Sequence, residues 1–122
     1  MSVERTVDAF LSAIERGDVD TISKIYHDKV EVWHNFSNAI QEKKVNIALL
    51  AATMKLGALK YTIHERQIVG DRVIQRHELT IKGHSGRVWK IPVAMFITVR
   101  EDQIVRIDEY VDTAQLEGLV GR

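Results

Sequence analysis

Residues 88–100 read VWKIPVAMFITVR, and their pattern is the clearest indication of the fold in the chain. Every second side chain from Trp89 to Val99 is apolar, which is the period of a β-strand that packs one face against a core. The same period appears in three further stretches, at 59–69, 73–82 and 103–112. Short turns built on glycine or aspartate separate these stretches. The second half of the chain therefore predicts an antiparallel meander.

The first half of the chain is predicted to be mainly helical. Apolar side chains recur at helical spacing over residues 3–16, and Gly17 ends this helix. Asp18 is placed to cap a second helix, and a strand at about 30–36 follows it. Residues 42–56 predict a third helix, which is apolar over much of its circumference. We therefore expect other elements to cover it on more than one side. Together these elements predict an α+β fold, with helices packed on one face of a curved sheet.

Length and composition limit the class of protein. We expect residues 1–122 to form a single domain. Its 17 basic and 17 acidic side chains leave no charge excess for a nucleic acid. Without cysteine there is no disulfide or thiolate metal site, and the histidines lack metal-binding spacing. No signal peptide or membrane-length apolar run is present, so we expect a cytoplasmic protein without membrane contact.

Glu109 is the most informative single residue. It shares one face of its strand with three apolar side chains, Val105, Ile107 and Val111. Burying a bare carboxylate costs several kcal/mol unless the carboxylate is paired or protonated. Arg76 and Glu78, which share one face of another strand, are natural candidates to compensate it. An ionisable group on an apolar face is also a candidate functional residue.

The pattern of residues 73–82 leaves open which face points inward. Leu79 and Ile81 occupy one face, whereas Arg76 and Glu78 occupy the other with one isoleucine and one threonine. Taken alone, Arg76 and Glu78 are more often an ordinary surface ion pair. In the same way, Trp33 is more often a core residue and Asn35 a turn cap.

Four short motifs are spread over nearly the whole chain. They are Gly17-Asp18-Val19-Asp20, Trp33-His34-Asn35, Arg76-His77-Glu78 and Ile107-Asp108-Glu109-Tyr110-Val111-Asp112. In this order they resemble the nuclear-transport-factor-2-like, or SnoaL-like, superfamily, and most closely its limonene-1,2-epoxide hydrolases. Glutamates replace that family's two aspartates at Glu78 and Glu109, and Trp33 replaces its tyrosine. The resemblance implies a cystatin-like α+β barrel: a cone-shaped, curved, mixed or antiparallel sheet with three N-terminal helices on its concave face.

The resemblance also implies a reaction. Glu109 would be the general base that activates a water held by Asn35 and Trp33, and Glu78 would protonate an epoxide oxygen. Arg76 would lie between the two carboxylates. Substrate-binding residues would be His34, Leu50, Met54 and Met95, in an apolar pocket for a small lipophilic epoxide. No metal, nucleotide or flavin would be needed.

Two other functions stay open. A polyketide-cyclase-like or ketosteroid-isomerase-like enzyme could use His34 or Glu109 as a base on an acidic C–H bond. Phe10 stands where the isomerases have a hydrogen-bonding tyrosine, which places isomerisation below hydrolysis. A non-catalytic small-ligand-binding module of the same fold is the other alternative. Ala94 and Phe96 make the long strand apolar on both faces, so we also expect a homodimer through the outer face of the sheet.

Overall fold

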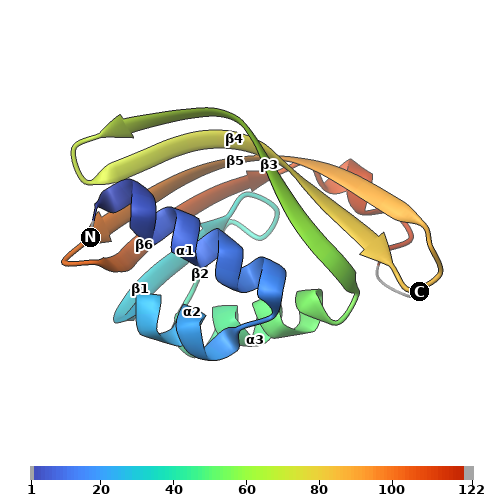
Figure 1. The fold of residues 1–122 in the computed structure, drawn as a ribbon, viewed down its shortest axis with the longest axis horizontal. Coiled ribbons are helices and arrows are strands. Elements are labelled where there is room, and N and C mark those ends of the chain that lie inside the picture. The colour runs from blue at the N-terminus through green and yellow to red at the C-terminus, as the bar shows by residue number, and fades with distance from the viewer. Residues whose placement is uncertain (1, 120–122) are drawn as a thin grey trace.

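A computed structural model describes residues 2–119, in which a curved sheet arches over the helices (Figure 1). The helices are α1 (Val3–Arg16), α2 (Val19–Ile25) and α3 (Lys43–Met54), with a 3₁₀ turn η1 (Thr113–Leu116) near the end. The strands are β1 (Tyr26–His34), β2 (Ala39–Gln41), β3 (Gly57–Val69), β4 (Arg72–Gly83), β5 (Val88–Arg100) and β6 (Gln103–Val111). The predicted α+β fold, with three helices on one face of a curved mixed sheet, is confirmed.

The sheet is open, with strand order β2-β1-β6-β5-β4-β3. Neighbouring strands run antiparallel except β1 and β6, which run parallel. This pairing brings His34, at the end of β1, opposite Glu109, near the end of β6. The parallel pairing of β1 with β6 therefore brings residues that are far apart in the sequence side by side.

Local capping explains why α1 and α2 begin and end where they do. The Ser2 hydroxyl accepts a hydrogen bond from the Arg5 N–H at 3.1 Å and caps α1. Gly17 then adopts a left-handed conformation, with φ of 70°, and its N–H donates to the Ile14 carbonyl at 3.1 Å. The Asp18 carboxylate accepts from the Thr21 N–H at 3.1 Å and caps α2. These contacts fix both ends of α1 and the start of α2.

The core lies between α1, α2 and the concave face of the sheet. Its most deeply buried members, at 0–2% exposure, include Val7, Ile14, Ile22, Val73, Ile97, Ile104 and Ile107. Burying each such side chain contributes roughly 1.5–3 kcal/mol. The face of each strand that carries these residues is the inner face of the sheet.

α3 is held differently from α1 and α2. Asn46 is its one buried residue, and Val45 and Leu49 are 48% and 38% exposed. Asn46 Oδ1 accepts from the Tyr26 hydroxyl at 2.6 Å, and its amide nitrogen donates to Gln41 at 2.9 Å. Among residues 2–119, α3 contacts α2, β1 and β3, and Ile47, Leu50 and Met54 are partly buried against the core, while the side that carries Val45 and Leu49 is uncovered. α3 is thus held by both apolar and polar contacts.

Sequence-predicted strand ends differ from the structure at β1 and β2. β1 begins at Tyr26, whereas the sequence predicts a start at about residue 30. The difference arises because the polar residues His27, Asp28 and Lys29 hide the apolar alternation there. Its pairing with β6 is also irregular between Tyr26 and Glu31. β2 has only three residues and was not predicted. In residues 2–119, no helix combines the length and apolar character needed to cross a membrane.

Candidate functional site

The strand register lines up one row of side chains across the inner face of the sheet. His34 lies opposite Glu109, Glu109 opposite Met95, Met95 opposite Gln75, and Gln75 opposite Arg66. The row two residues away is the buried core row Val32, Ile107, Ile97 and Val73. Because side chains alternate along a strand, both rows face the same side. Four strands, β1, β6, β4 and β3, thus place polar groups beside the core, and β5 contributes the apolar Met95.

His34 and Glu109 are neighbouring ionisable side chains in this row, and their polar atoms are in close contact. His34 Nε2 lies 3.0 Å from Glu109 Oε1, and the two side chains are 6% and 21% exposed. A carboxylate only accepts hydrogen bonds, so Nε2 carries the shared hydrogen. The His34 ring also packs against Phe36, with centroids 4.9 Å apart. The Glu109 carboxylate is thereby held at the inner face while solvent still reaches it.

Arg66, Gln75 and His77 form a hydrogen-bonded chain next to that pair. Arg66 Nε donates to Gln75 Oε1 at 2.9 Å, and Gln75 Nε2 lies 3.0 Å from His77 Nδ1. Arg66 Nη1 also contacts two α1 carboxylates, Asp8 at 2.7 Å and Glu4 at 3.3 Å. Helix α1 therefore fixes the guanidinium over the sheet. We call His34, Glu109, Arg66, Gln75 and His77 the inner polar cluster.

The surroundings of His77 keep its imidazole neutral. Burial lowers the pKa of His77 to about 4. The Glu109 carboxylate raises this pKa, whereas the positive charges of Arg66 and His64 lower it. The His77 ring is 2% exposed. Near neutral pH, His77 is thus an uncharged group with one N–H to donate.

Two tyrosines border the inner polar cluster. Burial, then the Glu109 charge, raises the pKa of Tyr61 and of Tyr26 above the ordinary tyrosine value. Tyr61 packs edge-on against His77, with ring centroids 5.1 Å apart. Both phenols therefore keep their protons near neutral pH, and the Tyr26 hydroxyl already donates its hydrogen to Asn46.

Three buried polar atoms of the cluster have no hydrogen-bond partner among residues 2–119: His34 Nδ1, Arg66 Nη2 and His77 Nε2. A buried polar atom without a partner costs about 1–3 kcal/mol. All three belong to the inner polar cluster. Such a concentration of unused donors and acceptors is typical of a site that binds another molecule.

The predicted substrate-binding residues lie on the inner side of the sheet. His34 is in the polar row, and Met95, which is 5% exposed, lies between Gln75 and Glu109 in the register. Leu50 and Met54 of α3 are half-buried against the core. Of these apolar side chains, Met95 is the one that the register places directly beside the cluster.

The prediction that Arg76 and Glu78 meet Glu109 in one chamber is wrong. Both lie on the outer face of β4, because Gln75 and His77 occupy its inner face. Arg76 Nε pairs with Glu65 Oε1 at 2.9 Å, and these side chains are 63% and 55% exposed. Arg76 and Glu78 cannot compensate the Glu109 charge from there. His34 is the partner of Glu109 instead.

Trp33 and Asn35 do not place their side chains at the Glu109 carboxylate as expected, although the Asn35 N–H donates to the Glu109 carbonyl at 3.1 Å. Trp33 packs edge-on against Tyr110 on the outer face, with centroids 5.1 Å apart. Asn35 Oδ1 accepts from the Val111 N–H at 2.9 Å, and its amide nitrogen donates to the Val111 carbonyl at 3.3 Å. Asn35 therefore extends the β1–β6 pairing. His34, which lies between Trp33 and Asn35 in the sequence, points inward.

Residues 66, 75 and 77 were missed as site residues. One signal could have revealed His77 and Gln75, because both share a strand face with Leu79 and Ile81. Arg66 had no comparable signal. A register irregularity in β3 between Ile63 and Glu65 changes the alternation just before it.

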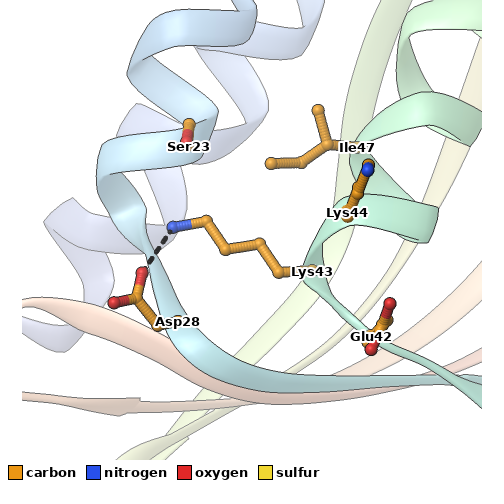
Figure 2. A pocket seen from close by; sticks show the side chains of 6 residues that line it. All are labelled: Ser23, Asp28, Glu42, Lys43, Lys44 and Ile47. Carbon is orange, nitrogen blue, oxygen red and sulfur yellow. Dashed lines mark hydrogen bonds and ion pairs between the residues drawn. The ribbon is translucent and has the colours of Figure 1, made fainter.

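A separate hollow of about 430 Å³ lies between α2, the start of β1 and the first turn of α3 (Figure 2). Lys43 reaches across it, and its Nζ donates to the Tyr26 carbonyl at 3.0 Å and to Asp28 at 3.2 Å. The hollow lacks histidine and is lined by Ser23, Asp28, Glu42, Lys43, Lys44 and Ile47. Across residues 2–119, no three His, Asp or Glu side chains gather to hold a metal ion.

Comparisons with known proteins support the fold. IdmH from Streptomyces antibioticus, a candidate polyketide cyclase, is similar over 100% of both chains, at 15% identity and a TM-score of 0.86. An LEH-like epoxide hydrolase of M. tuberculosis is 19% identical, with a TM-score of 0.78 over 93% of this chain and 84% of that one. AclR from Streptomyces galilaeus, a candidate hydroxylase, is 13% identical, with a TM-score of 0.83 over 93% of this chain and 77% of that one.

Sequence comparison is more specific than these structural similarities. No curated protein sequence matches the chain. A family model described as a SnoaL-like domain, however, matches residues 7–107, which include most of α1, all six strands in whole or in part, and the inner polar cluster except Glu109. The chain belongs to the family of SnoaL-like domains.

Proposed function

We propose that this protein is an enzyme that removes a proton from a carbon next to a carbonyl group of a small, largely apolar molecule. The observation that carries this proposal is the His34–Glu109 pair, at 3.0 Å, on the apolar inner face of the sheet. His34 faces Oε1 of the carboxylate, which leaves its second oxygen free to accept a proton. Glu109 is the base in this proposal, and His34 orients it.

Proton removal by Glu109 conserves atoms and electrons. One Glu109 oxygen is held by the hydrogen of His34 Nε2, and the other takes the substrate proton. The electron pair of the broken C–H bond forms a C=C bond to the carbonyl carbon, and the C=O π pair moves to oxygen. The resulting enolate either regains a proton at another carbon, as in an isomerase, or attacks a second carbonyl, as in a cyclase.

The surroundings of Glu109 suit this chemistry. Tyr61, Tyr26 and neutral His77 are all within electrostatic reach of its carboxylate. Tyr61 and His77 can donate hydrogen bonds without competing as bases, whereas the Tyr26 hydroxyl already donates to Asn46. Met95 beside Glu109 and half-buried Leu50 and Met54 offer apolar contact for a lipophilic substrate. IdmH, a structural neighbour, is a candidate polyketide cyclase, which is the same class of chemistry.

Epoxide hydrolysis is the second candidate. The motif resemblance and the LEH-like epoxide hydrolase neighbour support it. Glu109 could activate a water, but the oxygen must also be protonated as the ring opens. Glu78, expected to supply that proton, and Arg76, expected to lie between the two carboxylates, are on the outer face. Hydrolysis would need another donor, such as the Tyr61 hydroxyl, so we rank it below proton abstraction.

Isotope exchange tests the proposal directly. The wild-type protein is incubated in D₂O with a panel of cyclic ketones and 1,3-diketones, and deuterium incorporation is followed by NMR. We expect exchange that falls by a factor of about 10²–10⁴ in Glu109→Gln. Asp108→Asn is the matched control, because Asp108 is the preceding residue of β6, faces outward and pairs with Arg106 at 2.7 Å. Its exchange rate should equal that of the wild type.

A parallel panel of epoxides in ¹⁸O-labelled water separates the rival functions. Labelled diol without carbon exchange would favour hydrolysis over our proposal. If neither panel is turned over while apolar ligands bind, the protein is a binding module and the proposal is wrong. Exchange that survives in Glu109→Gln would also contradict the assigned base.

A further inference from the structure

We infer that Arg66 and Gln75 fix His77 as the neutral tautomer with its hydrogen on Nε2, and that this N–H binds the carbonyl oxygen of the substrate. His77 is thereby an oxygen-binding group for the proposed function, and this second half of the inference rests on that function. His77 is then a substrate-contacting residue, whereas Arg66 and Gln75 are positioning residues.

Arg66 sets the direction of the hydrogen bonds, because its guanidinium has only donors. Its Nε donates to the Gln75 side chain at 2.9 Å, so the Gln75 atom there must be the amide oxygen. Asp8 at 2.7 Å and Glu4 at 3.3 Å hold the guanidinium from α1, so it cannot readily turn away. The orientation of the Gln75 amide is therefore set, with its NH₂ group toward His77.

That orientation decides which His77 nitrogen is protonated. Gln75 Nε2 donates, and His77 Nδ1 at 3.0 Å must accept. A neutral imidazole with an accepting Nδ1 carries its hydrogen on Nε2. A protonated imidazole would place N–H groups of Gln75 and His77 face to face. The chain of hydrogen bonds thus favours one tautomer and opposes the imidazolium form.

His77 Nε2 is then a buried donor without a partner among residues 2–119. The groups that face the ring are Tyr61, His64 and Arg66 from β3, Gln75 from β4 and Glu109 from β6. Burial lowers the pKa of His77 to about 4, in agreement with the neutral form that the hydrogen bonds require.

The position of His77 suits binding of the substrate oxygen. Its strand β4 is separated from Glu109 on β6 only by β5, a backbone separation of about 10 Å from the usual strand spacing. Side chains from both strands rise on the same face over Met95. A carbonyl compound between them would present its oxygen to His77 and its acidic C–H to Glu109. A neutral N–H stabilises the developing enolate oxygen without losing its proton.

The first test measures the tautomer in the wild-type protein without substrate. In ¹⁵N-histidine-labelled full-length protein, long-range ¹H–¹⁵N spectra distinguish a protonated from an unprotonated ring nitrogen. We expect a protonated Nε2 and an unprotonated Nδ1 for His77, unchanged from pH 8 to about pH 5, since its pKa is about 4. A hydrogen on Nδ1, or titration near the ordinary value of 6.5, would overturn the inference.

The second test reverses the hydrogen bond. In Gln75→Glu, a carboxylate faces His77 Nδ1 and accepts, so the hydrogen should move to Nδ1 and the His77 pKa should rise. Exchange activity should fall by about 100-fold in kcat with a smaller change in KM. Thr80→Val, on the outer face of the same strand, is the control and should keep the wild-type spectrum and rate. An unchanged His77 spectrum in Gln75→Glu would overturn the assigned positioning role.

The two readouts separate this inference from the proposed function. The expected tautomer together with no exchange activity in any variant would reject the proposed function and, with it, the substrate-binding half of the inference. Exchange activity with the opposite tautomer would leave the function intact and reject the role of Arg66, Gln75 and His77. His77→Gln, which offers an N–H at a similar reach, should recover part of the activity that His77→Ala loses.

Discussion

The two faces of β4 carry similar polar residues and place them in opposite environments. On the inner face, Gln75 and His77 are 3% and 2% exposed and form part of the inner polar cluster. On the outer face, the Arg76 side chain is 63% exposed and pairs with Glu65, while Glu78 lies beside Pro92 and Thr62 in the register. Residues one position apart thus differ in burial, partners and chemistry.

This difference shows how a spacing motif can point to the wrong face of a strand. An arginine two residues from a glutamate fits a catalytic pair and a surface ion pair equally well. A catalytic pair is distinguished from a surface ion pair by the apolar side chains that share its face of the strand. Val73 and Ile81 are 0% and 1% exposed and share their face with His77. The polar residue whose strand face carries more apolar side chains is the better candidate for a site residue.

The largest expected effect contrasts residues of the two faces in catalysis. His34→Gln removes the histidine that orients Glu109, and we expect a fall in kcat of about 10²–10³-fold. Arg76→Gln removes an outer-face ion pair and should leave kcat within about twofold, because exposed pairs contribute little. Steady-state exchange rates measure both. A greater loss in Arg76→Gln than in His34→Gln would contradict the inner site.

Stability should show the same contrast with a somewhat smaller effect. Ile97, on the inner face of β5, is 0% exposed, and Ile97→Ala should cost about 2–5 kcal/mol of unfolding free energy. Ile74, on the outer face of β4, is half-buried, and Ile74→Ala should cost about 1 kcal/mol. Urea unfolding gives both values. Equal losses would mean that the outer face is also buried, as it would be in a stable dimer.

Much of the fold was predictable from local pattern. The period-two alternation of residues 88–100 matches the bounds of β5, and Gly17 and Asp18 separate α1 from α2 as expected. These features depend on neighbours in sequence, so the sequence alone carries them. The first residues of β1 and all of β2 were missed, because polar side chains or short length hide their alternation.

The site was less predictable because it depends on contacts between distant strands. The phase of Glu109 indicated the apolar face, and Glu109 lies there with 21% side-chain exposure. Its partner was misassigned, because the parallel register of β1 and β6 brings His34 opposite it. Arg66 enters the cluster only through a register irregularity in β3. Long-range register of this kind cannot be inferred from one strand.

Stability should depend on pH through His77. Burial lowers the pKa of His77 in the folded protein to about 4, from an ordinary value of 6.5 in the unfolded chain. Between these values the unfolded chain binds the extra proton, so stability falls as the pH falls from about 6.5 to about 4. The full shift is worth up to about 3 kcal/mol. The wild type should therefore lose stability relative to His77→Phe as the pH is lowered through this range, and a constant difference would contradict the neutral buried histidine.

The outer face is where we expect a second copy of the chain to bind. Tyr110 is 48% exposed there and packs against Trp33 at 5.1 Å and Phe96 at 6.2 Å. Exposed aromatic clusters are typical of interfaces, and truncating a central aromatic costs about 2 kcal/mol or more of binding. Light scattering at micromolar concentration should report a dimer for wild type and a weaker one for Tyr110→Ala. A wild-type monomer would refute this pairing.

The smallest expected effect is the coupling between Arg76 and Glu65. Both side chains are more than half exposed in the single chain, so their double-mutant cycle should give a coupling of about 0.2–1 kcal/mol. The size of this coupling distinguishes two states of the outer face. A coupling well above that range at high protein concentration, lost on dilution, would mean that a partner chain covers the pair and removes its water. A small coupling at every concentration would mean that this part of the outer face stays in solvent, which confines any dimer contact to the aromatic residues around Tyr110.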